Sequence, residues 1–484
     1  MRRFGGLASF VFLSVGLAAG LCVGACGGGQ SFPDASSIDA VSFDGNTTPD
    51  ATPSGDITVT THSRVGGGPS GTLVADVPVF TVQPDGTAGP SGTTSASGDL
   101  TLTGVKAGAS VTAVYPVNGG YQLVTVLAVK PGDHVVLGDH YLAPLGTSTG
   151  TMTVTFPTVP NAAYYYGYNR CSSASVNDGA ATSMTFATTC GNATADMSFE
   201  AYDGKFARLG YASLHGAPYT DGATAAITAW TPATSGDNFA LSITGLGAAV
   251  DVVYFSTFAQ WTDGFRRAQQ DYYAQPAAGE AALMMTVPTG SDHVLAYAQL
   301  HQQTLQTGSQ ETYRVLAPSA TSVAMTAPTL PWLGQVTING AAQIAQWIPI
   351  GTGSYDAAVV FANWQRFDPS NESTTYYYWT ISVPPGQTSL SWAGLPTAIA
   401  DQLPTAADAV VGDMQLVDLS DAADYDALRA RPEWEWSCPG CASQQGDRTE
   451  PSSVAFPFDG AEGFNPSFAA GHASGPHRSR LLRH

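Results

Sequence analysis

Between residues 57 and 458 the chain alternates short apolar runs with turn residues. Runs such as 77–82 and 122–129 are rich in valine and other β-branched or aromatic residues, a pattern typical of strands. Clusters of turn residues separate the runs, for example Pro84-Asp85-Gly86 and Pro131-Gly132-Asp133. The pattern predicts an all-β fold built from several β-sandwich domains in tandem.

Two stretches depart from the strand pattern. Residues 265–273 (FRRAQQDYY) have the composition of a short helix. Residues 421–431 (DAADYDALRAR) predict one or two helical turns.

The first 26 residues have the organisation of an export signal. Arg2 and Arg3 precede an apolar stretch over about 5–21, and Val23-Gly24-Ala25 leads into Cys26. This resembles the lipobox of bacterial lipoproteins. The resemblance implies that Cys26 becomes the lipidated N-terminus, and the glycine after it implies transfer to the outer membrane. Two other interpretations stay open: the uncharged run could span a bilayer as a signal anchor, or an ordinary signal peptidase could cut near Ala25.

A second resemblance covers the first predicted sandwich. The motifs DVPV at 76–79, TSASGDL at 94–100 and LTGVKAG at 102–108 occur in the order found in the carboxypeptidase regulatory-like (transthyretin-like) β-sandwich. The chain departs from that family at Ser95, where Asp is usual, at Leu100, where an aromatic residue is usual, and at Lys106, where Pro is usual. The resemblance implies a structural accessory module. Together with the strand pattern it gives tandem immunoglobulin-like or transthyretin-like sandwiches.

Changes in composition and turn signals set the expected domain boundaries. We expect a lipoprotein signal peptide at 1–25, a disordered acidic Gly/Ser/Pro tether at 26–56, a carboxypeptidase regulatory-like sandwich at 57–145, further sandwiches at 151–232, 233–331 and 332–458, and a disordered tail at 459–484.

Charge and composition narrow the function classes. The net charge is −20 and only 12% of residues are charged, whereas 44% are apolar. Nucleic acid is therefore not an expected partner, because its recognition requires a basic surface. The apolar content is ample for packed cores, as in exported sandwich proteins.

Four cysteines remain after Cys22 leaves with the signal and Cys26 is lipidated. In an oxidising compartment we expect two local disulfides, Cys171–Cys190 and Cys438–Cys441. The second pair also has redox C-x-x-C spacing, but no βαβ pattern surrounds it and Pro439-Gly440 favours a turn. A structural disulfide is the preferred interpretation.

Candidate catalytic and metal motifs are weak. Residues 146–150 (GTSTG) match G-x-S-x-G, but they lie in an interdomain linker without the strand-turn-helix context of a nucleophile elbow. The nine histidines are scattered and form no H-E-x-x-H motif. The sequence therefore predicts no catalytic residue, no metal site and no cofactor.

Dense aromatic runs are the remaining candidates for ligand binding. The strongest candidates are Tyr376, Tyr377, Tyr378 and Trp379, and residues 164–166 form a similar run. Because alternate residues of a strand point to opposite faces, we expect that Tyr165, Tyr377 and Trp379 do not all face a core. Exposed rings would suit sugar stacking or a protein partner, whereas the competing interpretation places them in sandwich cores.

These observations predict a lipid-anchored protein of the cell envelope, exported to the outer membrane or cell surface. The expected role is non-catalytic, in adhesion or envelope organisation, with a glycan or an envelope protein as partner. The alternatives are a glycan-binding surface lipoprotein and a secreted hydrolase of unrecognised type.

Overall fold

The structure, a computed structural model, describes residues 52–63, 72–117, 119–139, 150–170, 172–188, 193–233, 239–262, 266–285, 290–302, 308–392, 397–436 and 444–450. These residues belong to one compact unit. The predictions for the signal peptide, for Cys26, for both disulfides (Cys171, Cys190, Cys438, Cys441), for the tail and for the tether up to residue 51 lie outside the described residues. The predicted end of the tether is wrong, because residues 54–56 already belong to strand β1 (Ser54–Ser63).

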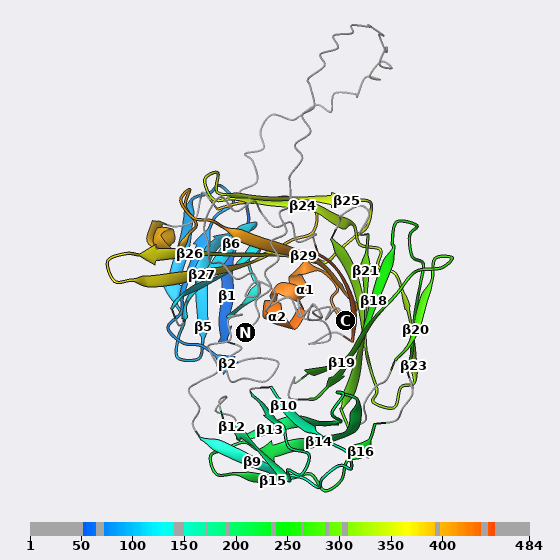
Figure 1. Ribbon diagram of the computed structural model, residues 1–484. Helices are drawn as coiled ribbons and strands as arrows, with labels where there is room; N and C mark the ends of the chain where they lie inside the picture. The colour runs from blue at the N-terminus through cyan, green and yellow to red at the C-terminus, as the bar shows by residue number, and fades with distance from the viewer. Residues whose placement is uncertain are drawn as a thin grey trace, which may run out of the picture. The chain divides into compact units, whose positions relative to one another are not determined.

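The prediction of an all-β sandwich fold is confirmed (Figure 1). The largest element is a twelve-stranded sheet, whose strands follow the order β19-β18-β21-β22-β30-β29-β26-β27-β7-β6-β3-β4. Their bounds, in chain order, are β3 (Pro78–Val82), β4 (Ala88–Thr93), β6 (Ala109–Val117), β7 (Gly120–Val129), β18 (Val252–Gln260), β19 (Arg266–Ala274), β21 (His293–His301), β22 (Ser309–Leu316), β26 (Ala357–Asp368), β27 (Ser373–Val383), β29 (Val411–Leu419) and β30 (Gln445–Glu450).

Smaller sheets complete the sandwiches. One joins β1 (Ser54–Ser63), β2 (Thr72–Leu73), β5 (Asp99–Lys106) and β8 (His134–Asp139). Two others join β17 (Phe239–Thr244), β20 (Ala281–Met285) and β23 (Ser322–Thr326), and β24 (Trp332–Asn339), β25 (Ile344–Ile350) and β28 (Ser389–Ser391). Each contributes apolar residues to a core shared with part of the large sheet, such as Val59 with Val111, Leu241 with Phe255, and Trp347 with Val360.

The second sandwich has two sheets of its own. One contains β10 (Tyr164–Asn169), β11 (Ser173–Val176), β13 (Thr194–Tyr202), β14 (Arg208–Pro218) and β16 (Thr231–Pro232); the other contains β9 (Thr151–Thr155), β12 (Ser183–Ala187) and β15 (Thr224–Ala226). Its core includes Met152, Tyr165, Phe186 and Phe199.

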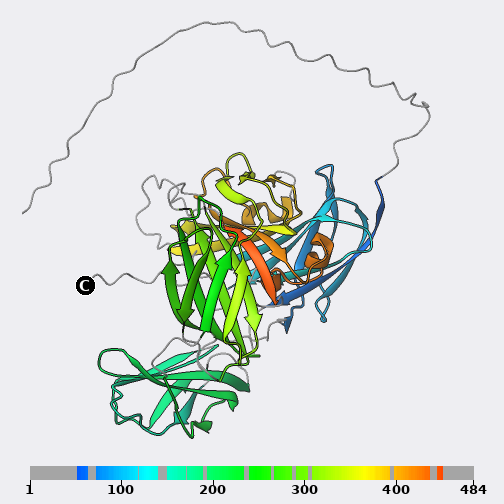
Figure 2. The same ribbon diagram turned by 90° about the vertical axis from the view of Figure 1, so that its right-hand side faces the viewer.

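The large sheet crosses the predicted domain boundaries. Strand β27 pairs in parallel with β7, joining Tyr376–Ser382 to Gly120–Val126. Strand β22 pairs with β30 from the far end of the described chain. In Figure 2 the strands coloured green to orange accordingly lie side by side. Three of the predicted sandwich regions thus share one hydrogen-bonded sheet.

The prediction of a helix at 265–273 is wrong, because the described residues of this segment belong to strand β19 (Arg266–Ala274). This strand pairs with β18 from Val253↔Ala274 to Gln260↔Arg266. Pairing with an adjacent strand outweighs the local helix propensity of the segment.

The prediction of helical turns at 421–431 is confirmed. Helix α1 (Tyr425–Arg429) is capped by the Asp424 carboxylate, which accepts from the Ala427 amide. Helix α2 (Glu433–Trp436) and the 3₁₀ helix η1 (Thr397–Gln402) are the other helical segments described. None of the described helices is long and apolar enough to cross a membrane.

Candidate functional site

The candidate site lies on the outer face of the second sandwich, on strands β10, β13 and β14. Side chains alternate along β13: Ala195, Met197, Phe199 and Ala201 enter the core. The residues between them, Asp196, Ser198, Glu200 and Tyr202, therefore point to the opposite face. In an isolated sandwich that face would meet solvent.

In this chain the polar face is buried. Asp196 and Ser198 are each 6% exposed, and Glu200 is 0% exposed. Strand β19 and the segment before β21 lie against it. A Cβ on Gly290 would stand 2.5 Å from the Ser213 hydroxyl of β14, which shows how closely the two parts approach.

Glu200 and Arg267 form an ion pair between the second sandwich and the large sheet. The Arg267 Nη2 lies 3.2 Å from Glu200 Oε2, and its guanidinium carbon lies 3.8 Å from the centre of the Tyr168 ring. Tyr168 in turn packs beside Ala259 and Trp261 of the large sheet region. A buried carboxylate requires such partners, because isolated burial of its charge is costly.

A second arginine and a tyrosine complete the surroundings of Glu200. Arg208 Nη2 lies 3.5 Å from Glu200 Oε1, and the Tyr202 hydroxyl donates to Glu200 Oε2 at 2.9 Å. Burial, with Glu200 adding to it, raises the pKa of Tyr202 above its ordinary value. Burial alone would lower the pKa of Arg208, but the Glu200 carboxylate outweighs it and the pKa is raised. At neutral pH Tyr202 is therefore neutral and Arg208 is charged.

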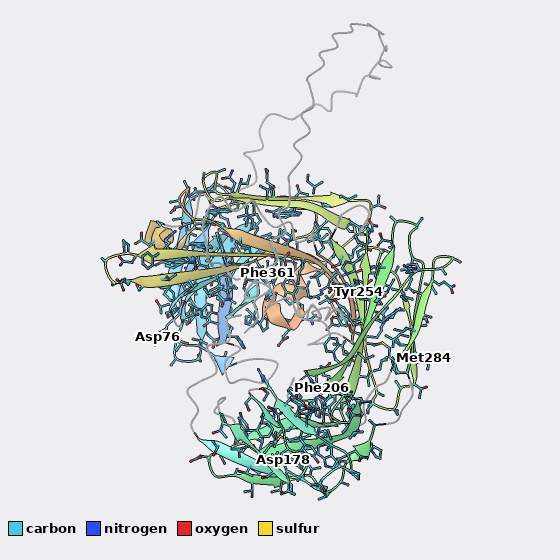
Figure 3. All side chains as sticks on the ribbon, in the orientation of Figure 1. Asp76, Asp178, Phe206, Tyr254, Met284 and Phe361 are labelled. Atoms are coloured by element: carbon cyan, nitrogen blue, oxygen red, sulfur yellow. The ribbon has the colours of Figure 1, made fainter. Side chains whose placement is uncertain are left out.

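A row of aromatic rings follows β10 on the same face. The Tyr166 and Tyr168 rings lie 6.4 Å apart at 10°, and Tyr166 meets the Tyr202 ring edge-on at 5.6 Å. At the other end Tyr164 stacks on Phe206 at 4.7 Å and 2°. Phe206 is 60% exposed (Figure 3). Its φ of +61° is in the left-handed region, which a bulky residue adopts only at a cost.

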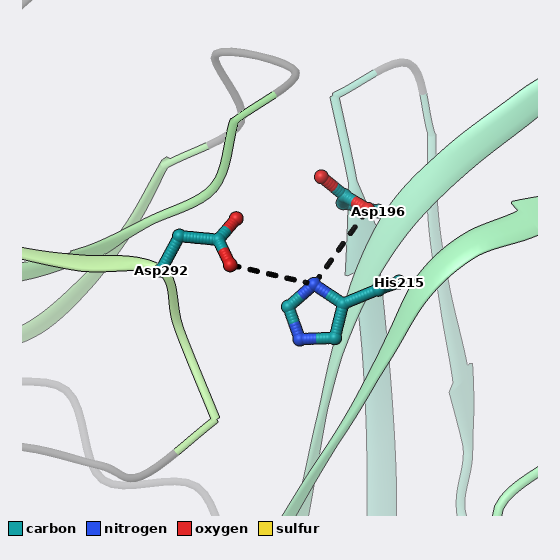
Figure 4. A group of neighbouring side chains, drawn as sticks. All are labelled: Asp196, His215 and Asp292. Carbon is teal, nitrogen blue, oxygen red and sulfur yellow. Dashed lines mark ion pairs between the residues drawn. The ribbon is translucent and has the colours of Figure 1, made fainter.

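At one end of this face a histidine meets two carboxylates (Figure 4). His215 Nδ1 of β14 lies 3.9 Å from Asp196 Oδ1 of β13 and 3.8 Å from Asp292 Oδ1, just before β21. One ligand atom from each residue lies within 4.8 Å of the other two. Nitrogen and oxygen donors in this arrangement are suited to a divalent metal ion.

The predicted aromatic residues of β27 divide between two faces. Tyr377 and Trp379 are 7% and 2% exposed and lie in the core that β24, β25 and β28 share with the large sheet, whereas Tyr376 is 42% exposed. Tyr378 is half-buried on the same face as Tyr376. Of the four candidates, Tyr376 presents the most open ring.

The expectation that Tyr165, Tyr377 and Trp379 do not all face a core is wrong, since all three are buried. Tyr377 and Trp379 are two residues apart and share a face, and Tyr165 enters the separate core of the second sandwich. The exposed aromatic surface comes from Tyr376 and from residues outside the run, including Phe206 and Phe367.

One described cavity, of about 400 Å³, lies between β22, the end of β23 and β25. Its lining includes Trp332, Leu330, Ile350, Gln302 and Gln310, and no acid, base, histidine or cysteine is among the lining residues. Of the GTSTG motif only Gly150 is described, and it precedes β9, a strand, as the sequence suggested.

Several residues of this face were not predicted from the sequence, namely Asp196, Glu200, His215, Arg267 and Asp292. They come from different strands and share no motif. One local signal was present: His215-Gly216 interrupts an otherwise regular strand, as a bulge does.

Comparisons with known proteins identify no family. No protein-family model matches the sequence, and no curated protein matches it. Among solved structures, the Bacillus anthracis TIE protein is 12% identical over 57% of this chain and 50% of its own, with a TM-score of 0.16. This chain thus spans half the length of that protein.

Two other similar structures are a shaft pilin from Lactobacillus rhamnosus GG and a tetra-tandem repeat from the extending region of a large adhesion protein. The pilin is 10% identical over 37% of this chain and 98% of its own, with a TM-score of 0.13. The repeat is 11% identical over 75% and 94%, also with a TM-score of 0.13. Scores this low carry no argument about fold or function, which depend here on the chain's own geometry.

Proposed function

We propose that this chain is a non-catalytic, lipid-anchored protein of the cell envelope that acts in adhesion. The observation that carries the proposal is Phe206, a large apolar side chain that is 60% exposed in a left-handed backbone conformation. Such strain costs about 1–3 kcal/mol and is concentrated at functional sites, including ligand clamps. An exposed ring held at this cost is an expected contact for a partner.

Further exposed apolar side chains support binding on open surfaces. Tyr273 on β19, and Phe367 and Tyr376 on the β26–β27 hairpin, are 68%, 62% and 42% exposed. They lie at an edge strand and a hairpin, where a partner has access without entering a cavity.

The adhesion proposal is tested with cells that carry the full chain or a variant. Phe206→Asn removes the ring and keeps a residue that tolerates left-handed φ. We expect cells with Phe206→Asn to adhere more weakly to the surface that the unaltered cells bind. Cells with Leu73→Ser, which removes another exposed apolar side chain (54% exposed), should adhere normally. Equal adhesion of the Phe206→Asn and unaltered cells, at matched surface amounts, would contradict the assignment of Phe206.

The anchor is tested separately. Cys26→Ser should stop incorporation of labelled fatty acid and release the protein from the membrane fraction. Unchanged attachment of this variant would favour a signal anchor, and release of both forms would favour ordinary signal cleavage.

A glycan is the second candidate ligand, favoured by the parallel Tyr164–Phe206 stack and by the open Tyr376 ring. Flat aromatic faces stack on apolar sugar faces. Polysaccharide pull-down with the full chain should lose signal with Tyr376→Ala or Phe206→Asn. Absence of binding to a broad glycan array would leave a protein as the ligand.

A further inference from the structure

A break in the pairing of β13 and β14 brings His215 and Asp196 together. Ala195 pairs with Ala217, but Met197 pairs with Leu214. Two residues, His215 and Gly216, therefore stand opposite the single residue Asp196. This is a β-bulge, a feature that redirects side chains and is frequent beside functional sites.

Gly216 makes the bulge feasible. Its φ of +56° is in the left-handed region that glycine adopts without steric cost. Its amide donates to Asp196 Oδ1 at 2.8 Å, which fixes the orientation of that carboxylate. The backbone thus positions one acidic ligand and the neighbouring imidazole in a single local structure.

The third residue, Asp292, comes from the large-sheet part of the chain, just before β21. Asp292 Oδ2 accepts from the Thr262 amide at 2.8 Å, which leaves Oδ1 directed at His215. Both carboxylates are therefore held by backbone donors in the way that metal-ligating carboxylates usually are. The two holding contacts arise on separate parts of the chain and converge on one point.

The distances are suited to an ion between the three groups. At 3.8 and 3.9 Å, His215 Nδ1 is beyond hydrogen-bond range of either carboxylate oxygen. Ligands about 2.1 Å from a tetrahedral zinc ion lie about 3.4 Å from one another. Shifts of less than about 1 Å in each side chain would thus bring His215 Nδ1 and the two carboxylate oxygens to coordination distance.

The donor set favours a transition metal over calcium. Calcium takes six to eight oxygen ligands in proteins, whereas an imidazole nitrogen is a common ligand of zinc and similar ions, which also accept carboxylate oxygens. The His215 side chain is 50% exposed and that of Asp292 is 28% exposed. Water therefore has access to a fourth coordination position.

We propose that Asp196, His215 and Asp292 bind one divalent transition-metal ion of the zinc class, and that this ion joins the second sandwich to the twelve-stranded sheet. Because Asp196 and His215 belong to one part and Asp292 to the other, the bound ion stabilises their contact. Its role is structural and is independent of the adhesion ligand.

Zinc titration of the full chain by calorimetry tests the proposal. The protein is purified without a polyhistidine tag and stripped with chelator, and His472, His477 and His484 of the C-terminal segment are replaced by Gln in every sample. We expect one zinc ion per chain and a rise in the thermal unfolding midpoint on zinc addition. His215→Ala, Asp196→Asn and Asp292→Asn should each weaken binding at least tenfold.

The two asparagine variants keep an oxygen that accepts from the Gly216 and Thr262 amides, so the fold should persist even if His215→Ala unfolds. His134→Ala and Asp178→Asn, which alter exposed residues outside the cluster, should bind zinc normally. Cobalt(II) should give the visible absorption of a four-coordinate site in the parent protein, which carries only the three C-terminal Gln replacements, and lose it in the variants. Failure of this parent protein to bind zinc, zinc binding unaffected by the three substitutions, or a preference for calcium would each overturn the proposal.

Discussion

The buried Glu200–Arg267 contact gives a quantitative prediction about how the second sandwich is held. Arg267→Gln removes the partner at 3.2 Å and leaves a fully buried carboxylate beside Arg208 at 3.5 Å. Breaking a buried ion pair from one side costs about 3–5 kcal/mol. Since Arg208 remains, we expect the lower end, about 3 kcal/mol, with about 1 kcal/mol more for the lost contact with Tyr168.

Replacing the other partner of the pair, Glu200, should cost less. In Glu200→Gln the Arg267 side chain loses its contact with the Glu200 carboxylate but, at 29% exposed, can still be hydrated, so about 2 kcal/mol is expected. The double variant removes both charges of the Glu200–Arg267 pair, and Arg208 loses its Glu200 contact there just as it does in Glu200→Gln. Its free energy of unfolding should therefore exceed the additive value by about 2 kcal/mol, which is the coupling between contacting residues.

Denaturant unfolding of the four proteins, followed by circular dichroism, measures this cycle. Arg431→Gln is the control, because its pair with Asp421 at 2.8 Å contains no fully buried charge (the side chains are 23% and 37% exposed), so its loss should cost under about 1 kcal/mol. Coupling below about 0.5 kcal/mol, or equal costs for Arg267→Gln and Arg431→Gln, would refute the view that Glu200 and Arg267 fasten the sandwich to the sheet.

Three further predictions concern the large sheet. Trp379→Ala should destabilise the fold by about 3–5 kcal/mol, because Trp379 is 2% exposed and its Nε1 donates to Thr125 Oγ1. Tyr376→Ala should cost much less, because the Tyr376 ring is 42% exposed. Equal melting temperatures of the two variants would contradict this contrast. Gly120→Ala should unfold or strongly destabilise the chain, because its Cβ would stand 1.7 Å from the Tyr376 carbonyl oxygen, whereas Gly204→Ala, with nothing within 4 Å, should be tolerated in the same thermal assay. Burial raises the pKa of Asp413 from 3.8 to about 6, so the folded state holds the proton more tightly and the free energy of unfolding falls as pH rises from about 4 to 6. Asp413→Asn should remove up to about 3 kcal/mol of that fall in denaturant titrations across this pH range. An unchanged dependence on pH would show that other carboxyls cause the fall.

Strand positions followed from the sequence because a strand leaves a local pattern of apolar runs and turn residues. The run at 122–129, for example, is part of β7 (Gly120–Val129). The pairing of β7 with β27 leaves no such pattern, since the two strands lie more than two hundred residues apart and either could pair elsewhere. For the same reason the sequence suggested separate sandwiches and did not show that three regions share one sheet.

Residues 266–274 show why local propensity was insufficient. Arginine, alanine and glutamine favour a helix, yet each backbone amide and carbonyl facing β18 gains a partner when the segment is extended. The same strand carries Arg267 to Glu200. The wrong helix assignment therefore also concealed one half of the Glu200–Arg267 ion pair.

The candidate site could not be predicted because a polar face covered by another part of the chain has the same sequence pattern as one exposed to water. Asp196, Ser198 and Glu200 alternate with core residues as any solvent-facing set would. What distinguishes them is the complementary set on the other part, with Arg267 opposite Glu200 and Asp292 opposite His215. A face with only apolar partners would bind wherever it was covered, whereas charged partners at both ends fix one orientation. The polar residues of this face therefore specify how the second sandwich sits on the sheet, while the aromatic row between them extends outward to the exposed Phe206.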